Sequence, residues 1–157
     1  MMMEGRRITQ VGPERTTMRF MIIRKADEET EAGARASEEL VAAMARYVEE
    51  MVKAGVMIMG DGLKPSSHGA RVKFSGGRPT VIDGPFTETK ELVAGVSIID
   101  VASKEEAIEW VRRWPTLDGH GNVEIEIRPL YELEELGDGA GIDHHARLRE
   151  EMRDRRS

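Results

Sequence analysis

The stretch Thr17-Met18-Arg19-Phe20-Met21-Ile22-Ile23-Arg24 decides the fold class of this sequence. It is a compact apolar run with the length of one β-strand. Successive side chains of a strand point to opposite faces of a sheet. Phe20 and Ile22 share one face, and Met21 and Ile23 share the other, so both faces are largely apolar. The stretch therefore predicts a sheet that is covered on both sides.

Residues 56–60 are predicted as a second strand with the same two-sided pattern. Val56 and Ile58 share one face, whereas Met57 and Met59 share the other. An apolar face that extends over several strands is too large a patch to stay in water. We expect two such sheets to pack together in a homodimer, which gives a closed, dimeric α/β barrel. The alternative is a monomer whose own C-terminal tail folds over this face.

A helix is predicted over residues 37–54. Ser37 can cap its first turn, and Gly55 can supply a left-handed stop. Its apolar side chains recur at the spacing of one helical stripe. The stripe consists of Leu40, Val41, Met44, Tyr47, Val48, Met51 and Val52. For this stripe we favour packing against the core.

The remaining elements complete a recognisable order. Strands are expected at residues 70–74, 79–82, 92–101 and 123–128, and the first two of them form a hairpin. A second helix is expected to begin at the capping box Ser103-Lys104-Glu105-Glu106 and to end at Pro115. The order is β-α-β, an inserted hairpin, then β-α-β. It predicts an α+β fold, a ferredoxin-like sandwich with an inserted β-hairpin. In the last strand Glu124, Glu126 and Arg128 share one face, so part of that surface is expected to stay wet.

Composition excludes several classes of function. The 157 residues include no cysteine, which rules out disulfides, thiolate metal sites and cysteine nucleophiles. The net charge of −6 and the 4% aromatic content argue against direct binding of nucleic acid. No apolar run is long enough to cross a bilayer, and we expect neither a secretory signal nor a membrane partner. The expected location is the cytoplasm.

Three segments are expected along the chain. Residues 1–17 are predicted as a disordered extension and residues 18–131 as the folded domain. Residues 132–157 are predicted as a charged, mobile tail, because glycines interrupt any pattern and charged residues then dominate.

Several motifs resemble a known group, the YCII-related proteins, and within it the branch named for an Asp-Gly-Pro-Phe motif. That motif is Asp83-Gly84-Pro85-Phe86, followed by Thr87-Glu88-Thr89-Lys90-Glu91. The supporting segments are Lys53-Ala54-Gly55-Val56, Gly60-Asp61-Gly62-Leu63-Lys64-Pro65-Ser66, Ala70-Arg71-Val72, Ser103-Lys104-Glu105-Glu106-Ala107 and Glu126-Ile127-Arg128-Pro129-Leu130. The resemblance runs from about Met18 to Tyr131, and it implies a ferredoxin-like, dimeric α/β barrel.

The resemblance implies little about chemistry. Related YCII proteins carry a histidine soon after the first strand, paired with an aspartate in a cleft and proposed as catalytic. This chain has Arg24-Lys25-Ala26-Asp27-Glu28-Glu29 there and no histidine. Genes of the branch often lie beside extracytoplasmic-function sigma factors, which implies a link to transcriptional regulation.

Three side chains are the candidate catalytic residues. Asp83 could present a carboxylate to a cleft as a base, with Lys90 nearby as a cation. The structural interpretation of the same segment is a turn, in which Asp83 accepts backbone N–H bonds, Gly84 permits an unusual φ and Phe86 fills the core. We favour the structural interpretation, because turn chemistry accounts for every residue type. His120 is the third candidate, a titratable group just before the last strand.

The sequence leaves two possible functions, one as a binding protein and one as an enzyme. The first is a dimeric barrel that binds a small molecule or a protein partner. The second is a cofactor-free lyase or isomerase that uses Asp83, Lys90 and His120 as acid/base groups. No cofactor and no metal is predicted for either function.

Overall fold

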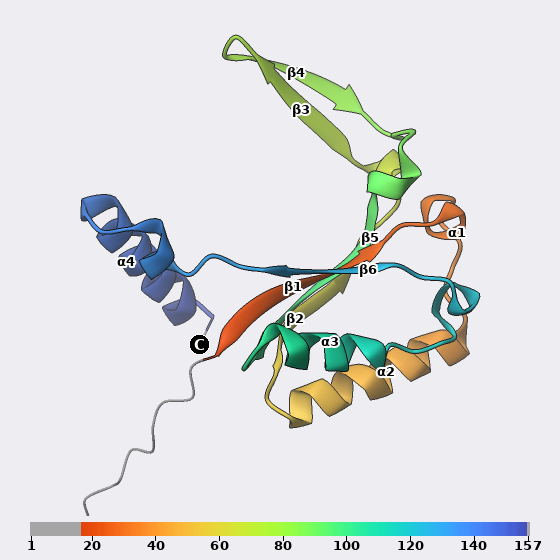
Figure 1. Ribbon diagram of the computed structural model, residues 1–157. Coiled ribbons are helices and arrows are strands. Elements are labelled where there is room, and N and C mark those ends of the chain that lie inside the picture. Colours follow the sequence, from red (N-terminus) through yellow and green to blue (C-terminus); the bar gives the residue numbers. More distant parts are fainter. Residues whose placement is uncertain (1–16, 157) are drawn as a thin grey trace, which may run out of the picture.

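The computed structural model describes residues 17–156 and has a four-stranded antiparallel sheet with two helices on one face (Figure 1). The strands are β1 (Met18–Lys25), β2 (Met57–Gly62), β5 (Val93–Val101) and β6 (Ile125–Pro129). The covering helices are α2 (Glu38–Lys53) and α3 (Lys104–Arg112). The strand order β2-β5-β1-β6 is consistent with a ferredoxin-like fold, and the α+β prediction is confirmed.

The helix caps predicted from the sequence are present at the ends of α2 and α3. The Ser37 side chain accepts a hydrogen bond from the Leu40 N–H, and Gly55 has a φ of 73° just beyond the end of α2. The Ser103 side chain accepts from the Glu106 N–H and caps α3 in the same way. These caps satisfy N–H groups that the first turn leaves without helical partners.

The core lies between the two helices and one face of the sheet. Every second residue of β1 points into it, from Phe20 through Ile22 to Arg24. The buried apolar residues are Phe20, Ile22, Tyr47, Met51, Val56, Ile99, Val101 and Ala107.

The opposite face of the sheet has an apolar centre without a covering element. Met21 and Ile23 lie on this face, and the strand register places Met21 directly beside Ile98. Charged side chains border it, among them Glu126 beside Ile23 and Arg128 beside Met21. Both faces of β1 are thus apolar, as predicted, but within residues 17–156 no element covers the second face of the sheet. The single subunit therefore does not form the closed barrel.

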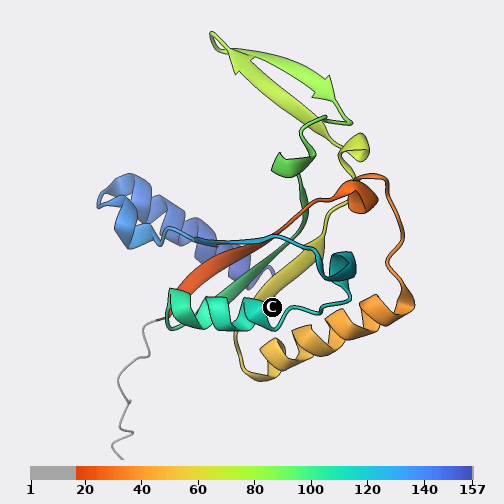
Figure 2. The same cartoon turned by 45° about the vertical axis from the view of Figure 1, so that its right-hand side comes forward.

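The predicted hairpin consists of β3 (Ala70–Ser75) and β4 (Arg78–Asp83). It forms a separate two-stranded sheet that projects from the body on the side away from α2 and α3 (Figures 1 and 2). All of its strand residues are exposed.

Several elements were not anticipated from the sequence. They are the helix α1 (Glu28–Glu31), the 3₁₀ turns η1 (Ser66–His68), η2 (Thr89–Glu91), η3 (Asp118–Gly121) and η4 (Leu133–Leu136), and the helix α4 (Ala140–Asp154). The helix α4 lies in the segment expected to be a mobile tail, to which the pattern assigned no element. The predicted extension at residues 1–17 lies outside the described residues, apart from Thr17.

Candidate ligand pocket beneath helix α2

A pocket of about 710 Å³ lies between α2 and the sheet. Its lining comes from α2, from β2 and β5, from the segment that carries α1, and from the turn η3. The body of the pocket is apolar, and acidic groups and a histidine are gathered toward η3 and α1. This combination is typical of small-molecule sites in proteins.

Small residues on the sheet create the pocket floor. The register places Gly60 beside Ser97 and Gly62 beside Gly95, on the face of the sheet that α2 covers. A Cβ added at Gly62 would meet no atom within 4 Å. Because these positions bring little or no side chain, the space between sheet and helix stays unfilled.

Apolar side chains of α2 form the roof. Tyr47 and Met51 of the predicted stripe are buried in the core. The residues nearer the start of the helix, from Leu40 to Met44, line the pocket and are partly or fully exposed. The prediction of core packing therefore holds for Tyr47 and Met51, with Met44 and Val48 partly buried against the core, whereas Val41 and Val52 are exposed.

Arg24 closes one end of the pocket with a buried ionic network. Its Nε and Nη2 donate to the two carboxylate oxygens of Asp118 at 3.1 and 2.8 Å. Its Nη1 donates to Asp27 Oδ2 at 3.1 Å and to the Lys25 carbonyl oxygen at 2.7 Å. The arginine is only 7% exposed. All three nitrogens of its guanidinium donate within the protein, which uses four of its five N–H groups, so Arg24 holds this end of the site together.

The ionic network also shifts the pKa values of Asp118 and Arg24. Burial raises the pKa of the Asp118 carboxyl, but hydrogen bonds from Arg24 and from Trp114 Nε1 (2.9 Å) outweigh it and hold this pKa below its usual value. The hydrogen bond to Asp118 in turn raises the pKa of the Arg24 guanidinium. Both groups are therefore charged at neutral pH.

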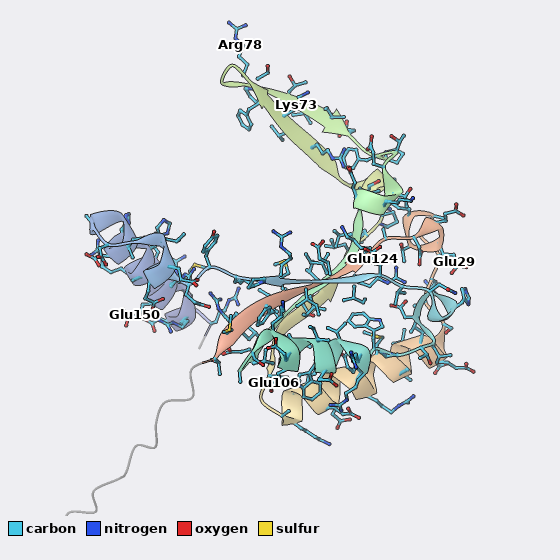
Figure 3. All side chains as sticks on the ribbon, in the orientation of Figure 1. Glu29, Lys73, Arg78, Glu106, Glu124 and Glu150 are labelled. Atoms are coloured by element: carbon cyan, nitrogen blue, oxygen red, sulfur yellow. The ribbon has the colours of Figure 1, made fainter. Side chains whose placement is uncertain are left out.

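The turn η3 presents His120 at the mouth of the pocket. Gly119, His120 and Gly121 have φ values of 56°, 56° and 81°, three consecutive left-handed residues. This conformation costs a residue other than glycine about 1 kcal/mol. His120 Nε2 lies 3.1 Å from Glu29 Oε1, so the histidine and a carboxylate of α1 meet at the mouth. Figure 3 labels Glu29 on α1.

Gly119 is required where this turn crosses the ionic network. A Cβ at this position would lie 2.6 Å from Val123 Cγ1 and 3.4 Å from Arg24 Nη2. The turn is therefore wrapped tightly around the arginine, which fixes the position of the next residue, His120.

Comparison with known proteins places the chain in a family. The model of the YCII-related domain matches residues 18–132. The chain belongs to the YCII-related family. One relative is an uncharacterized protein, R00369, from Rhizobium meliloti (strain 1021), which is 35% identical over 103 residues. That similarity covers 65% of this chain and 80% of the relative.

Of the predicted site residues in this YCII-related protein, only His120 lies at the pocket. Asp83 ends β4 and pairs with Ala70 in the hairpin register, and Lys90 lies in η2. Both are exposed, and neither lines this pocket. Instead, the structure brings His120 together with Glu29, a residue that sequence reasoning did not single out.

The Asp-Gly-Pro-Phe segment packs against η1 at the base of the hairpin. A side chain at Gly84 would overlap the Ser66 carbonyl oxygen, so only glycine fits. Ser66 Oγ accepts from the Phe86 N–H at 3.0 Å and donates to Glu31 Oε2 at 2.7 Å. Phe86 is half-buried beneath the Arg71 guanidinium, which lies 3.8 Å from its ring centre. The expectation that Phe86 fills the core is wrong, because the ring belongs to the hairpin base.

No helix within residues 17–156 has the length and apolar character needed to cross a membrane.

Proposed function

We propose that this YCII-related protein binds an apolar small molecule in the pocket beneath α2. The pocket itself carries the proposal, since its volume of about 710 Å³ lies within the range of roughly 300–1,000 Å³ that is usual for small-molecule sites. Its apolar body would take the bulk of the ligand.

The polar mouth narrows the chemistry of the ligand. Four of the five N–H donors of Arg24 already bind Asp118, Asp27 and the Lys25 carbonyl oxygen, and the two carboxylates balance its charge. Four acidic residues line the pocket against two arginines, Arg24 and Arg35, so the charge of the lining disfavours an anionic ligand. The Glu29 carboxylate and the His120 imidazole are exposed at the mouth, where they can meet a ligand. They suit a hydroxyl or amino group at the end of an apolar molecule.

A panel of soluble apolar compounds, followed by thermal shift, tests this proposal. Binding to the folded state raises the melting temperature by mass action. We expect apolar alcohols and amines to raise it more than carboxylates of the same carbon skeleton. Equal or absent shifts throughout the panel would contradict the proposal.

We also infer that the uncovered sheet face packs against the same face of a second copy. The support is the apolar centre formed by Met21, Ile23 and Ile98 on the sheet face opposite to α2 and α3. Side chains of both charges surround this apolar centre, namely Glu126 and Arg128 on β6 and Asp61 on β2. A two-fold arrangement can bring such opposite charges together, and it closes the barrel that one subunit leaves open.

An acid/base enzyme is the second candidate, favoured by the contact between His120 and Glu29. A carboxylate that orients an imidazole is a common arrangement for proton transfer. Asp83 and Lys90 would join this site only through a change of arrangement at the hairpin base. If an activity is found, His120→Gln should abolish it and Asp83→Asn should test the role of the second carboxylate.

The motif Asp83-Gly84-Pro85-Phe86 supports placement in the Asp-Gly-Pro-Phe branch of the family. A connection with sigma-factor regulation follows from that placement alone. Co-purification with a sigma factor would support it.

A further inference from the structure

The projecting hairpin has one apolar and one basic face. The register places Val72 opposite Val81 and Phe74 opposite Pro79, so these four side chains share a face. The other face carries the cations Arg71, Lys73 and Arg78. Phe74 is 67% exposed and Val81 66%. Figure 3 shows Arg78 at the tip and Lys73 along one strand.

This apolar face needs a partner. A two-stranded hairpin alone is only marginally stable in water. Within residues 17–156, the hairpin meets the body at its base, where Gly84 packs on Ser66 and Arg71 covers Phe86. Large apolar side chains gathered on an isolated, exposed ribbon mark an interaction surface.

The helix α4 carries a second apolar surface. Leu148 and Met152 are four residues apart and so share one face of the helix. Leu148 is 41% exposed and Met152 59%. Figure 1 shows α4 to one side of the sheet, joined to the body through η4.

The hairpin and α4 lie at opposite ends of the strands. The hairpin stands beyond the end at which β1 finishes, and α4 lies beyond the end at which β1 begins (Figures 1 and 2). Both extend on the uncovered side of the sheet. When two such sheets face each other about a two-fold axis perpendicular to the strands, the hairpin of each subunit reaches the α4 end of the other.

Charge favours this pairing over the alternative. Hairpin residues 70–83 carry three cations and one carboxylate, a net charge of +2. Residues 132–156 carry eight carboxylates and five arginines, a net charge of −3 with neutral histidines. A two-fold axis along the strands would place hairpin beside hairpin and tail beside tail, and both contacts would be repulsive.

We propose that the apolar face of the hairpin docks on α4 of a second copy of this chain. The proposal rests on the sheet-to-sheet pairing inferred under the proposed function, and it specifies which segments meet. Val72, Phe74 and Val81 pack against Leu148 and Met152 of the other copy. The interface is isologous, so each dimer contains two such contacts.

Single-cysteine variants test the contact, because the chain contains no cysteine and every disulfide must then join two chains. Phe74→Cys and Met152→Cys chains with different tags are co-expressed and mildly oxidised. We expect a disulfide between the two different chains and none in either variant alone. The matched control replaces Met152→Cys by Glu105→Cys, which is exposed on α3 at the opposite side of the sheet.

Each of the other possible results would refute a specific part of the docking proposal. Disulfides in the Phe74→Cys variant alone would show hairpin beside hairpin and refute docking on α4. Absence of the mixed disulfide in a sample that sediments as a dimer would refute the contact while leaving the sheet pairing intact. Sedimentation as a monomer would refute both. None of these results bears on ligand binding in the pocket beneath α2, which the thermal-shift panel measures independently.

Discussion

Arg24 Nε and Nη2 bind the two carboxylate oxygens of Asp118 at 3.1 and 2.8 Å, across 94 positions of sequence. This ion pair joins the end of β1 to the turn η3, and Asp27 completes it from the start of α1. It therefore fixes the two segments that carry Glu29 and His120 at the pocket mouth.

Replacement of Arg24 by Met should destabilise the fold. Asp118 would keep a buried charge without its counterion, and removal of one partner of such a pair costs about 3–5 kcal/mol. Arg24→Lys should not restore the lost stability, because a lysine cannot bind both oxygens of Asp118 and also Asp27. Urea denaturation measures the change. The control is Arg128→Met, whose exposed pair with Glu126 should contribute at most about 1 kcal/mol.

Asp118 should also make stability depend on acid pH. Its pKa is lower in the folded chain than the usual 3.8, so its ionised form stabilises the fold above about pH 4. That contribution is lost as the pH falls through the folded-state pKa. The free energy of unfolding should therefore fall more steeply below pH 4 in the wild type than in Asp118→Asn. Identical pH profiles would contradict this role. Asp27, whose pKa is also lowered, accounts for the dependence expected to remain in the variant.

The secondary structure could largely be predicted, because its signals are local. Ser37 and Ser103 cap the two helices as their positions suggest, and the hairpin lies within one residue of its predicted bounds. The alternation in β1 also identified the two faces of the sheet correctly. Each of these features depends on neighbours within a few residues of the chain.

The pocket could not be predicted in the same way, since it depends on long-range register. Gly60, Gly62, Gly95 and Ser97 come together only when β2 pairs with β5. One signal was present in the sequence. Arg24 follows Phe20 and Ile22 on the buried face of β1, and a buried arginine requires carboxylate partners. A search for those partners would have pointed to Asp27 and Asp118.

Gly84→Ala should loosen the base of the hairpin. Its new methyl group would overlap the Ser66 carbonyl oxygen, and relief of such overlap typically costs about 1–3 kcal/mol. We expect faster proteolysis within residues 70–83. The matched control is Gly62→Ala, because a Cβ at that position meets no atom within 4 Å. Equal proteolysis of the two variants would argue against the packing of Gly84 on Ser66.

Ile98→Glu should convert the proposed dimer into a folded monomer. Ile98 lies beside Met21 at the centre of the uncovered sheet face, where a charge would be buried by a second copy. Val52→Glu is the control, since Val52 is 58% exposed on the helix side. Sedimentation of both variants at micromolar concentration measures the outcome. A wild type that sediments at the single-chain mass of 17.6 kDa would refute the sheet pairing.

Binding of an apolar molecule in the pocket beneath α2 can be measured by fluorescence titration with N-phenyl-1-naphthylamine, a neutral apolar dye. Ser97 lies on the pocket floor, so Ser97→Leu should fill the space, whereas Ser97→Ala should leave it open. Gly62→Leu provides a second way to fill it. We expect saturable binding at one site per subunit in the wild type and in Ser97→Ala. In Ser97→Leu and Gly62→Leu we expect an affinity at least about tenfold lower, with unchanged circular dichroism. Equal affinity of folded wild-type, Ser97→Leu and Gly62→Leu proteins would show that the dye binds elsewhere and would contradict the proposed binding in this pocket.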